Sequence, residues 1–370
     1  NDAHERRAGR FLAEALPGVS ITLSSAVCPE IREYERFSTA CANAYVQPLM
    51  ASYLERLAAQ LEQRGLRCPL YLMTSGGGLT TLETARRFPV RLVESGPAGG
   101  AILSAGLARE NGLHDVLSFD MGGTTAKICL IDDGKPQTAR TFEVARVGRF
   151  KKGSGLPLRI PVIEMVEIGA GGGSIARIDG LGLLQVGPDS SSADPGPSCY
   201  GRGGADATVT DADLVLGYLG ADSFLGGDMK LDVAAARAAM AKNIGKPLGL
   251  SVEEAAWGIH ELVNENMARA AAIHALEKAR RITDYAMVAI GGAGPVHAAH
   301  IGQKLGLARV ICPLGAGVAS AFGFLAAPTS FSFVRGRVEP LATLDFPALG
   351  KVLSGMEAEG RDRKSTRLNS

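Results

Sequence analysis

The sequence predicts an α/β fold, in which strands alternate with helices along the chain. Short apolar runs typical of buried strands occur at residues 70–73, 116–119 and 285–290. Segments with helical spacing of apolar residues lie between them, the longest at about residues 38–64 and 252–280. The 47 glycines cluster in turns that end strands, which is where α/β proteins place their ligand sites.

The other elements follow from local patterns. Residues 5–15 have a helical pattern, and residues 19–24 alternate like a strand. Pro48 lies inside the long helix and predicts a kink, because proline removes a backbone hydrogen bond. The remaining expected elements are a small-residue helix ending near Arg109, a strand at 128–131, a soft linker at 151–155, helices near 233–243 (with Asp232 as the N-cap) and 298–302, and a strand at 309–312.

The composition excludes several classes of protein. A net charge of +1 gives no electrostatic reason to expect nucleic acid or a membrane as a partner. The apolar stretches are shorter than the about 20 residues that span a bilayer, and no signal peptide is visible. The six cysteines are scattered without a C-x-x-C pair, so we expect reduced, mostly buried thiols in a cytoplasmic protein.

The turn Asp120–Thr125 lies between two expected strands. Gly122 and Gly123 let the backbone approach a ligand closely, and successive N–H groups there, with those of Thr124 and Thr125, can form an anion-binding concavity. Asp120, at the strand end, is a candidate ligand of Mg²⁺, which prefers oxygen. The turn does not open a helix, so it is neither a Walker nor a Rossmann motif. The alternative is a simple tight hairpin.

A second turn, Gly291–Gly294, follows the strand at 285–290 and opens a helix. Glycine at 291, 292 and 294 would let an adenosine ring lie against bare backbone. The alternative is an ordinary strand-to-helix loop. Together the two turns resemble the nucleotide site of the actin, sugar-kinase and Hsp70 superfamily, which implies an actin-like ATPase fold, with this chain supplying the second lobe plus an inserted glycine-rich region.

A longer ordered set of motifs makes a more specific resemblance. From residue 4 to about 325 the chain resembles the hydantoinase A / 5-oxoprolinase family, which also includes subunits of ketone carboxylases. The motifs that carry this resemblance are Tyr34-Glu35-Arg36, Asn43-Ala44-Tyr45, Ser75-Gly76-Gly77, Ser95–Gly100, Asp120–Thr125, Gly169–Ala176, Val186-Gly187-Pro188, Ala193–Pro197, Cys199–Gly204, Thr208–Ala212, Asn264–Met267 and Gly291–His297.

The resemblance implies an enzyme that uses ATP and Mg²⁺ to open a cyclic amide such as 5-oxoproline or a hydantoin, by phosphorylating its carbonyl oxygen. It also implies a partner subunit of hydantoinase B type. Two alternatives stay open: the ATP-using subunit of an acetone-type ketone carboxylase, and an ATP-regulated actin-like binding protein. The implied domains are residues 1–110 (the rest of the first lobe), 111–330 (the ATPase domain, with an insertion at about 134–210) and a tail, 331–370, that is partly disordered or foreign.

The glycine-rich block, residues 169–204, contains further candidate site residues. Gly171, Gly172, Gly173 and Ser174 offer adjacent N–H groups for a phosphate or an oxyanion. Arg202 is a candidate phosphate contact. Glu164 and Asp194 are candidate catalytic or positioning carboxylates. For Asp211 a capping role is favoured. Cys199 and Tyr200 are expected to have a packing role rather than a catalytic one.

Two positions depart from the family pattern. Lys127 stands where the family often has an acidic residue, and Val166 stands where a metal-binding Asp-x-His pair would have its histidine. Glu164 keeps a carboxylate there and Glu167 is an alternative on the other face of the strand, but a histidine-bound metal is not supported. For His297 and His300, solvated or capping roles are favoured over ligand roles, and His274 is expected to be a satisfied helix histidine.

The family's opening phosphate turn has no counterpart upstream of residue 1, and the start of the chain looks truncated. We therefore expect the isolated chain to fold substantially but to have weak or no ATPase activity. Isothermal titration with Mg·ATP and a phosphate-release assay measure this; tight binding together with turnover would contradict it.

Overall fold

The structure, a computed structural model, describes all residues except 1, 148–152, 331–332, 337–338 and 369–370. Helices and strands alternate along much of the chain, which confirms the α/β class. The chain divides into two compact units: unit 1 comprises residues 1–95, 139–162 and 327–370, and unit 2 comprises residues 96–138 and 163–326. Of the expected linker 151–155, residues 151–152 lie outside the described part.

This division differs from the domain limits expected from the sequence. Helix α5 (Ser95–Glu110), expected in the first domain, belongs to unit 2 almost entirely. Residues 139–162, expected inside the second domain, belong to unit 1. The chain passes from one unit to the other at residues 95–96, 138–139, 162–163 and 326–327. The second and third of these points lie in the short strands β6 (Thr138–Ala139) and β9 (Val162–Ile163).

Unit 1 is organised around α3 (Glu33–Gln63), which runs through Pro48 as one helix. Buried Asn43 in α3 donates to the carbonyl oxygen of Arg87 (3.2 Å) and accepts from the amide of Val90 (3.3 Å). The other elements are α1 (Ala3–Ala15), α2 (Ser24–Val27), β1 (Tyr71–Met73), β2 (Leu79–Thr81), α4 (Leu82–Arg87), η1 (Pro89–Leu92), β7 (Phe142–Val144), β8 (Leu156–Leu158), η7 (Leu341–Thr343) and α12 (Phe346–Leu368).

One expectation for unit 1 is wrong. Residues 19–23 form no strand, and Ser24 begins α2 instead. The carboxylate of Glu5 accepts the amide protons of Ser24 and Ser25 at the start of that helix and so stabilises it there. In the tail, α12 spans Phe346–Leu368.

Unit 2 contains a six-stranded sheet in the order β10-β4-β3-β13-β14, with β5 pairing with β4. Neighbours β10, β4 and β3 are antiparallel, whereas β3, β13 and β14 run parallel. The strands are β3 (Val116–Met121), β4 (Ala126–Asp132), β5 (Lys135–Pro136), β10 (Val166–Ile168), β13 (Ala286–Ile290) and β14 (Val310–Ile311).

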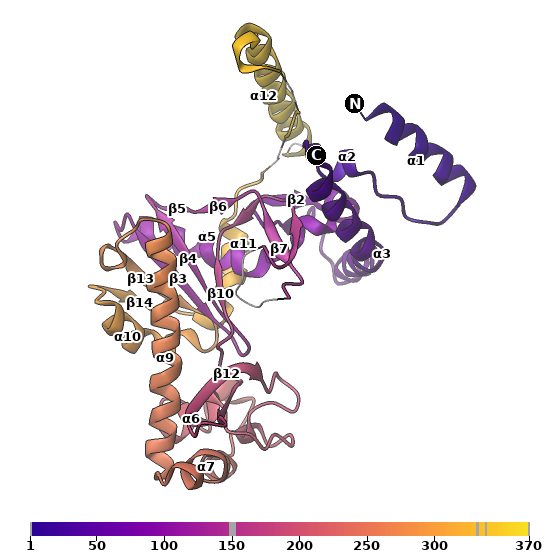
Figure 1. Cartoon of the computed structure of the whole chain (residues 1–370). Coiled ribbons are helices and arrows are strands. Elements are labelled where there is room, and N and C mark those ends of the chain that lie inside the picture. The colour runs from indigo at the N-terminus through magenta and orange to yellow at the C-terminus, as the bar shows by residue number, and fades with distance from the viewer. Residues whose placement is uncertain (1, 148–152, 331–332, 337–338, 369–370) are drawn as a thin grey trace. The chain divides into compact units, whose positions relative to one another are not determined.

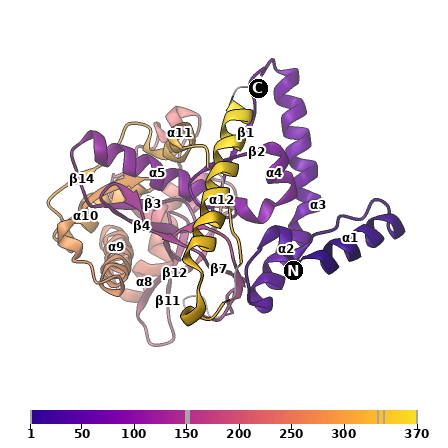
Figure 2. The same ribbon diagram turned by 90° about the horizontal axis from the view of Figure 1, so that it is seen from above.

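Helices cover both faces of this sheet (Figure 2). Leu117, Phe119 and Met121 alternate along β3 into one core with α9 (Val252–Glu277) and α10 (Gly294–Leu305). On the other face Ser118 shares a hydrogen bond of 2.9 Å with Ser104 of α5. Asp120 lies on this second face, because side chains alternate along a strand.

Helix α9 extends beyond the sheet (Figure 1). It begins with a capping box between Ser251 and Glu254, and its first half packs on the glycine-rich part of the unit. Asp232 caps α7 as expected, accepting from the amide of Ala235 at 2.9 Å. The other elements are β11 (Ser174–Ile178), β12 (Leu184–Ser190), η2 (Ser198–Tyr200), α6 (Val209–Val215), η3 (Phe224–Gly227), α7 (Val233–Met240), η4 (Ala241–Gly245), α8 (Lys246–Leu248), η5 (Ile282–Asp284), η6 (Ala316–Val318) and α11 (Ala319–Ala326).

Among the described residues, the helices lack a stretch apolar and long enough to cross a bilayer.

Asp132, at the end of β4, forms a pH-dependent tether that connects β4 to neighbouring segments of unit 2 through its carboxylate. Three side chains donate hydrogen bonds to its carboxylate: Tyr285, Gln137 and Arg280. Burial is the largest single influence and raises the pKa of Asp132, but these hydrogen bonds together outweigh it and hold the pKa below its ordinary value.

We therefore expect Asp132→Asn to lower the free energy of unfolding by about 1–2 kcal/mol at pH 7. Because the folded-state pKa is depressed, this stabilisation is fully present above the unfolded-state pKa of about 3.9 and is lost as the pH falls through the folded-state value. Urea unfolding at pH 7 and about pH 3 measures the difference. Asp133→Asn, at an exposed neighbour, is the control; an effect of Asp132→Asn that does not shrink at low pH would contradict the tether.

Candidate functional site: two glycine turns and a buried histidine cluster

The two glycine turns predicted from the sequence lie side by side. Strands β3 and β13 are parallel neighbours, with Asp120 opposite Ile290, so both turns leave the same edge of the sheet. The amide of Ala293 donates to the carbonyl oxygen of Met121 at 3.0 Å. The backbone of one turn is therefore bonded directly to the end of the strand that carries the other.

The carboxylate of Asp120 lies between two glycines. A Cβ built on Gly291 would lie 2.5 Å from Oδ1, and one built on Gly100 of α5 would lie 3.3 Å from Oδ2. Gly291 also has a φ of +84°, which favours glycine. Burial raises the pKa of Asp120, while the charge of Lys127, across from it in β4, lowers it to a smaller extent.

The turn that follows Asp120 has backbone N–H groups available for a ligand. The amide of Gly122 donates to the carbonyl oxygen of Thr125 at 3.0 Å and closes the turn. Within the described part of the chain, the amides of Gly123, Thr124 and Thr125 have no hydrogen-bond partner, and Gly123 and Thr124 are exposed. Successive backbone donors of this kind are what an anion-binding concavity is built from.

The glycine-rich segment Gly171–Ser174 does something different from the expectation. Gly172 and Gly173 donate their amides to the carbonyl oxygens of Gly122 (3.0 Å) and Gly123 (2.6 Å). The amide of Gly171 donates to the hydroxyl of Ser174 (2.9 Å), and that of Ser174 donates back to the carbonyl oxygen of Gly171 (3.0 Å). The prediction that these N–H groups face a ligand is wrong for this conformation, because all four are used inside the chain.

Close packing explains why this segment is glycine. A Cβ on Gly171 would lie 2.7 Å from backbone atoms of Gly123 and Thr124, and one on Gly172 would lie 2.8 Å from the hydroxyl of Thr210. Thr210 in turn donates its amide (2.7 Å) and its hydroxyl (2.8 Å) to the carbonyl oxygen of Gly172. Residues 171–173 thus pack directly against the Asp120–Thr125 turn and stabilise it through backbone hydrogen bonds.

The structure does not bring Glu164 to the glycine turns. Ile168 pairs with Ala126 beside the turn, so Glu164 lies beyond the far end of β10, where Lys278 donates to its carboxylate at 2.6 Å. Asp194 and Arg202 lie exposed outside the helices and strands, and within the described residues neither forms a hydrogen bond or ion pair with Asp120.

Asp211 is a cap, as favoured from the sequence. Its carboxylate accepts from the amides of Cys199 (2.7 Å) and Ser198 (3.2 Å) and takes part in the capping box with Thr208. Cys199 is fully buried, and burial followed by the charge of Asp211 raises its thiol pKa, so it packs rather than reacts.

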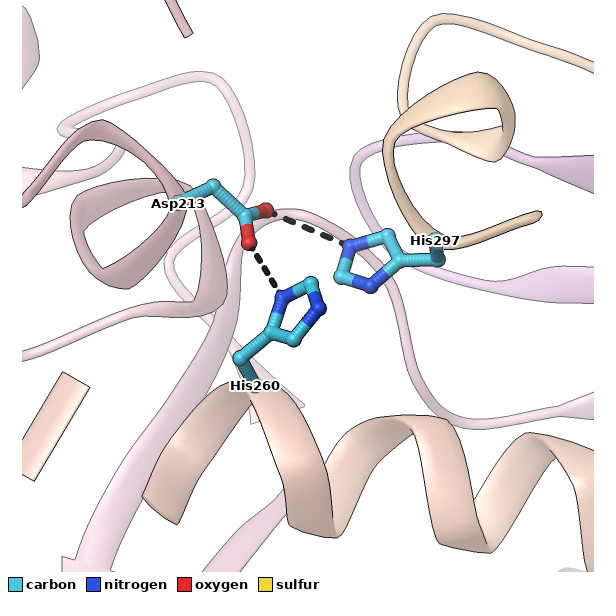
Figure 3. Close-up of side chains that lie close together, drawn as sticks. All are labelled: Asp213, His260 and His297. Atoms are coloured by element: carbon cyan, nitrogen blue, oxygen red, sulfur yellow. Dashed lines mark hydrogen bonds and ion pairs between the residues drawn. The ribbon is translucent and has the colours of Figure 1, made fainter. Parts of the chain in front are cut away.

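A cluster that the sequence did not reveal lies at the junction of three helices (Figure 3). Asp213 on α6 meets His260 of α9 and His297 of α10. One carboxylate oxygen lies 2.7 Å from Nδ1 of His260 and the other 3.2 Å from Nε2 of His297. All three side chains are buried, and the favoured solvated or capping role for His297 is therefore wrong.

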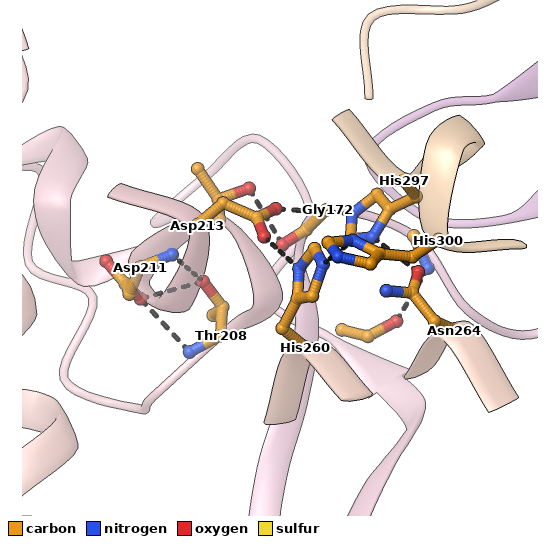
Figure 4. Close-up of polar contacts among 11 residues, drawn as sticks. Gly172, Thr208, Asp211, Asp213, His260, Asn264, His297 and His300 are labelled. Atoms are coloured by element: carbon orange, nitrogen blue, oxygen red, sulfur yellow. Dashed lines mark hydrogen bonds and ion pairs between the residues drawn. The ribbon is translucent and has the colours of Figure 1, made fainter. Parts of the chain in front are cut away.

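The cluster continues outward through further polar contacts (Figure 4). Nδ1 of His297 lies 2.8 Å from Oδ1 of Asn264, and Nε2 of His260 lies 3.1 Å from Nδ1 of His300. Burial is the largest influence on the pKa of Asp213 and raises it, but contacts with His260 and His297 reverse this and lower the pKa. Burial and then the neighbouring His260 lower the pKa of His300.

A sequence signal for this cluster does exist. His260 and Asn264 are four residues apart in a helix, and His297 and His300 are three apart, so each pair shares a helix face. Ile259 and Val263 each directly precede one member of the first pair, and these apolar neighbours indicate that this side of the helix is buried, as it is in the structure. Only the packing of α6 against α9 shows that Asp213 completes the group.

A separate cleft of about 1200 Å³ lies in unit 1, and none of the candidate residues from the sequence line it. It carries both signs of charge. Its charged lining includes Glu5, Glu30, Arg36, Arg87, Arg91 and Arg335.

The model of the hydantoinase/oxoprolinase family matches residues 36–332. The chain belongs to this family. The expected family is thereby confirmed, and the match includes both glycine turns and the histidine cluster.

Several family members are well matched. The caprolactamase subunit alpha of Pseudomonas jessenii is 39% identical over 323 residues, which cover 87% of this chain and 45% of that protein. The crystal structure of the ATP-dependent caprolactamase from the same organism has a TM-score of 0.78 at 35% identity and covers 98% of this chain and 51% of its own. The nucleotide-free structure of acetone carboxylase has a TM-score of 0.76 at 30% identity, with 88% of this chain and 45% of its own covered.

The chain spans about half the length of two of the curated relatives that it matches, 53% and 45%.

The two adjacent glycines of the second turn provide a matched pair of substitutions. Gly291→Ala puts a methyl group against Asp120 and the carbonyl oxygen of Met121 at a positive φ, and we expect it to lower the free energy of unfolding by about 2–4 kcal/mol. Gly292→Ala meets no atom within 4 Å and is expected to change it by less than about 0.5 kcal/mol. Urea unfolding followed by circular dichroism measures both. Equal effects would show that the close approach to Asp120 is not maintained in solution.

Proposed function

We propose that this chain is the ATP-using part of an enzyme that opens a cyclic amide such as 5-oxoproline or a hydantoin. The observation that supports it is the bond between the two glycine turns, which puts free backbone amides, a carboxylate and a bare-backbone surface within one small region. The family of the chain and the caprolactamase relatives agree with it, because caprolactam is also a cyclic amide.

Each part of Mg·ATP has residues that suit it. The unpartnered amides of Gly123, Thr124 and Thr125 would hold the phosphates. Asp120 would hold Mg²⁺, directly or through water, and Gly100 and Gly291 leave it the space. The adenosine would lie on the turn Gly291–Gly294. This use of the turns corresponds to the second lobe of an actin-like ATPase, which we propose as the architecture of unit 2.

The chemistry requires activation of an unreactive carbonyl. Amide resonance makes a lactam resistant to water. Transfer of the γ-phosphoryl group of ATP to the carbonyl oxygen breaks the bond to ADP and makes an imidate-like phosphate. Water then adds to that carbon, the ring C–N bond breaks, and inorganic phosphate leaves. The contribution of these residues is to position the phosphates and to neutralise their charge.

We propose a second subunit of hydantoinase B type for the ring-opening step. The caprolactamase relative is named as a subunit alpha, so an enzyme of this family can be divided between chains. The structural match to acetone carboxylase favours one other candidate, the ATP-using subunit of a ketone carboxylase, in which the same phosphorylation gives an enol phosphate.

Phosphate release by the complete protein, with and without its partner subunit, separates these functions. Stimulation by 5-oxoproline, hydantoin or caprolactam supports the proposed function, and stimulation by acetone with bicarbonate supports the carboxylase. ATP binding without stimulation by any of these compounds would indicate an actin-like binding protein instead.

Asp120→Asn tests the site within that assay. It keeps the shape of the side chain and removes the charge that would hold Mg²⁺, so we expect turnover to fall by about a hundredfold or more while the protein stays folded. Asp206→Asn, at an exposed carboxylate in the same unit, is the control and should keep turnover within about twofold. Unchanged turnover in Asp120→Asn would remove this residue from the site.

A further inference from the structure

The cluster of Asp213, His260 and His297 has no part in the proposed ATP chemistry. Its three residues come from three helices, and each side chain is no more than 3% exposed. One donor atom from each lies within 4.8 Å of the others. Burial of three polar groups in one place is unfavourable unless something satisfies them.

The outer contacts determine which nitrogen atoms point inward. Oδ1 of Asn264 lies 2.8 Å from Nδ1 of His297, so an amide oxygen that accepts there puts the ring proton on Nδ1. The Nε2 lone pair then faces the carboxylate of Asp213 at 3.2 Å, outside hydrogen-bond geometry, and Nε2 has no hydrogen-bond partner among the described residues. Two electron-rich atoms in a buried site repel each other unless a cation lies between them.

His260 fits the same arrangement. Its Nδ1 points at the carboxylate, and its Nε2 lies 3.1 Å from Nδ1 of the half-buried His300. An Nε2–H group that donates to His300 leaves Nδ1 as the inward lone pair. Histidines that bind a metal usually donate their second ring N–H to a carboxylate, a carbonyl oxygen or water, and the ring nitrogen of His300 is the acceptor here.

We propose that Asp213, His260 and His297 bind one divalent transition-metal ion of the zinc class. Two imidazole nitrogens and one carboxylate oxygen suit such an ion, whereas Mg²⁺ and Ca²⁺ prefer oxygen alone. Three protein ligands leave a fourth position for water. Metal–ligand bonds of about 2.0–2.1 Å at tetrahedral angles separate ligand atoms by about 3.3 Å, so binding lengthens the 2.7 Å contact between Asp213 and His260.

A bound metal would cross-link α6, α9 and α10, the helices that carry its three ligands. Thr210, one helical turn before Asp213 in α6, binds the carbonyl oxygen of Gly172, and Gly172 binds that of Gly122. His297 lies in the first turn of α10, directly after the Gly291–Gly294 turn. The ion would therefore stabilise both turns indirectly, through the helices that contact them, at a site separate from Asp120.

Metal content tests the proposal directly. The full chain is treated with a chelator, reloaded with Zn²⁺ alone, freed of excess ion and measured by elemental analysis. We expect about one ion per chain in the wild type and loss of the ion in Asp213→Asn, His260→Gln and His297→Gln. His274→Gln is the matched control, because His274 is also buried in α9 but lies outside the cluster; it should retain the ion.

A second readout uses the wild type alone, so that it does not depend on a variant that folds. Loading with Co²⁺ should give the visible absorption bands of a nitrogen- and oxygen-bound ion, and Zn²⁺ should displace them. Absence of these bands, or equal Zn²⁺ content in the wild type and the three cluster variants, would overturn the proposal. It would instead indicate a metal-free network, in which the Asn264 amide is rotated and Nε2 of His297 carries the proton. Neither readout requires ATP or substrate, so the result is independent of the proposed function.

Discussion

The parallel pairing of β3 with β13 is the constraint on which unit 2 depends. Parallel neighbours end at the same edge of a sheet, so the segments that follow Asp120 and Ile290 must share that edge. The amide of Ala293 then reaches the carbonyl oxygen of Met121. Glycine at 291 is required by this contact, because the backbone there has a positive φ and a Cβ would lie 2.5 Å from the Asp120 carboxylate.

The glycine-rich block owes its composition to backbone packing. Gly171 to Gly173 lie directly against the Asp120–Thr125 turn, and their amides are paired with its carbonyl oxygens. Any side chain at Gly171 would displace the turn. A glycine-rich sequence therefore indicates close approach, and the approaching group here is another part of the same chain rather than a ligand. Within the described part of the chain, the amides of Gly123, Thr124 and Thr125 in the turn have no hydrogen-bond partner, whereas those of residues 171–174 are paired.

Helix α6 shows how two neighbouring carboxylates acquire different roles. Asp211 accepts backbone amides at the start of the helix and is satisfied by them. Asp213, two residues further on, points instead at the histidines of α9 and α10, where each of its oxygens meets one ring. Both are buried, but only the second meets histidine side chains of other helices. The cluster of Asp213, His260 and His297 also connects α6, α9 and α10.

Local patterns in the sequence determined the α/β class, the main strands, the capping roles of Asp211 and Asp232 and the two glycine turns, because each depends on residues close together in the chain. The motif order was sufficient to indicate the family. Only the tertiary structure decided that the amides of residues 171–174 are used internally, that Glu164 lies away from the turns, and that Asp213 meets His260 and His297. These outcomes depend on sheet register and helix packing between residues tens of positions apart, and local periodicity contains no information on such distances.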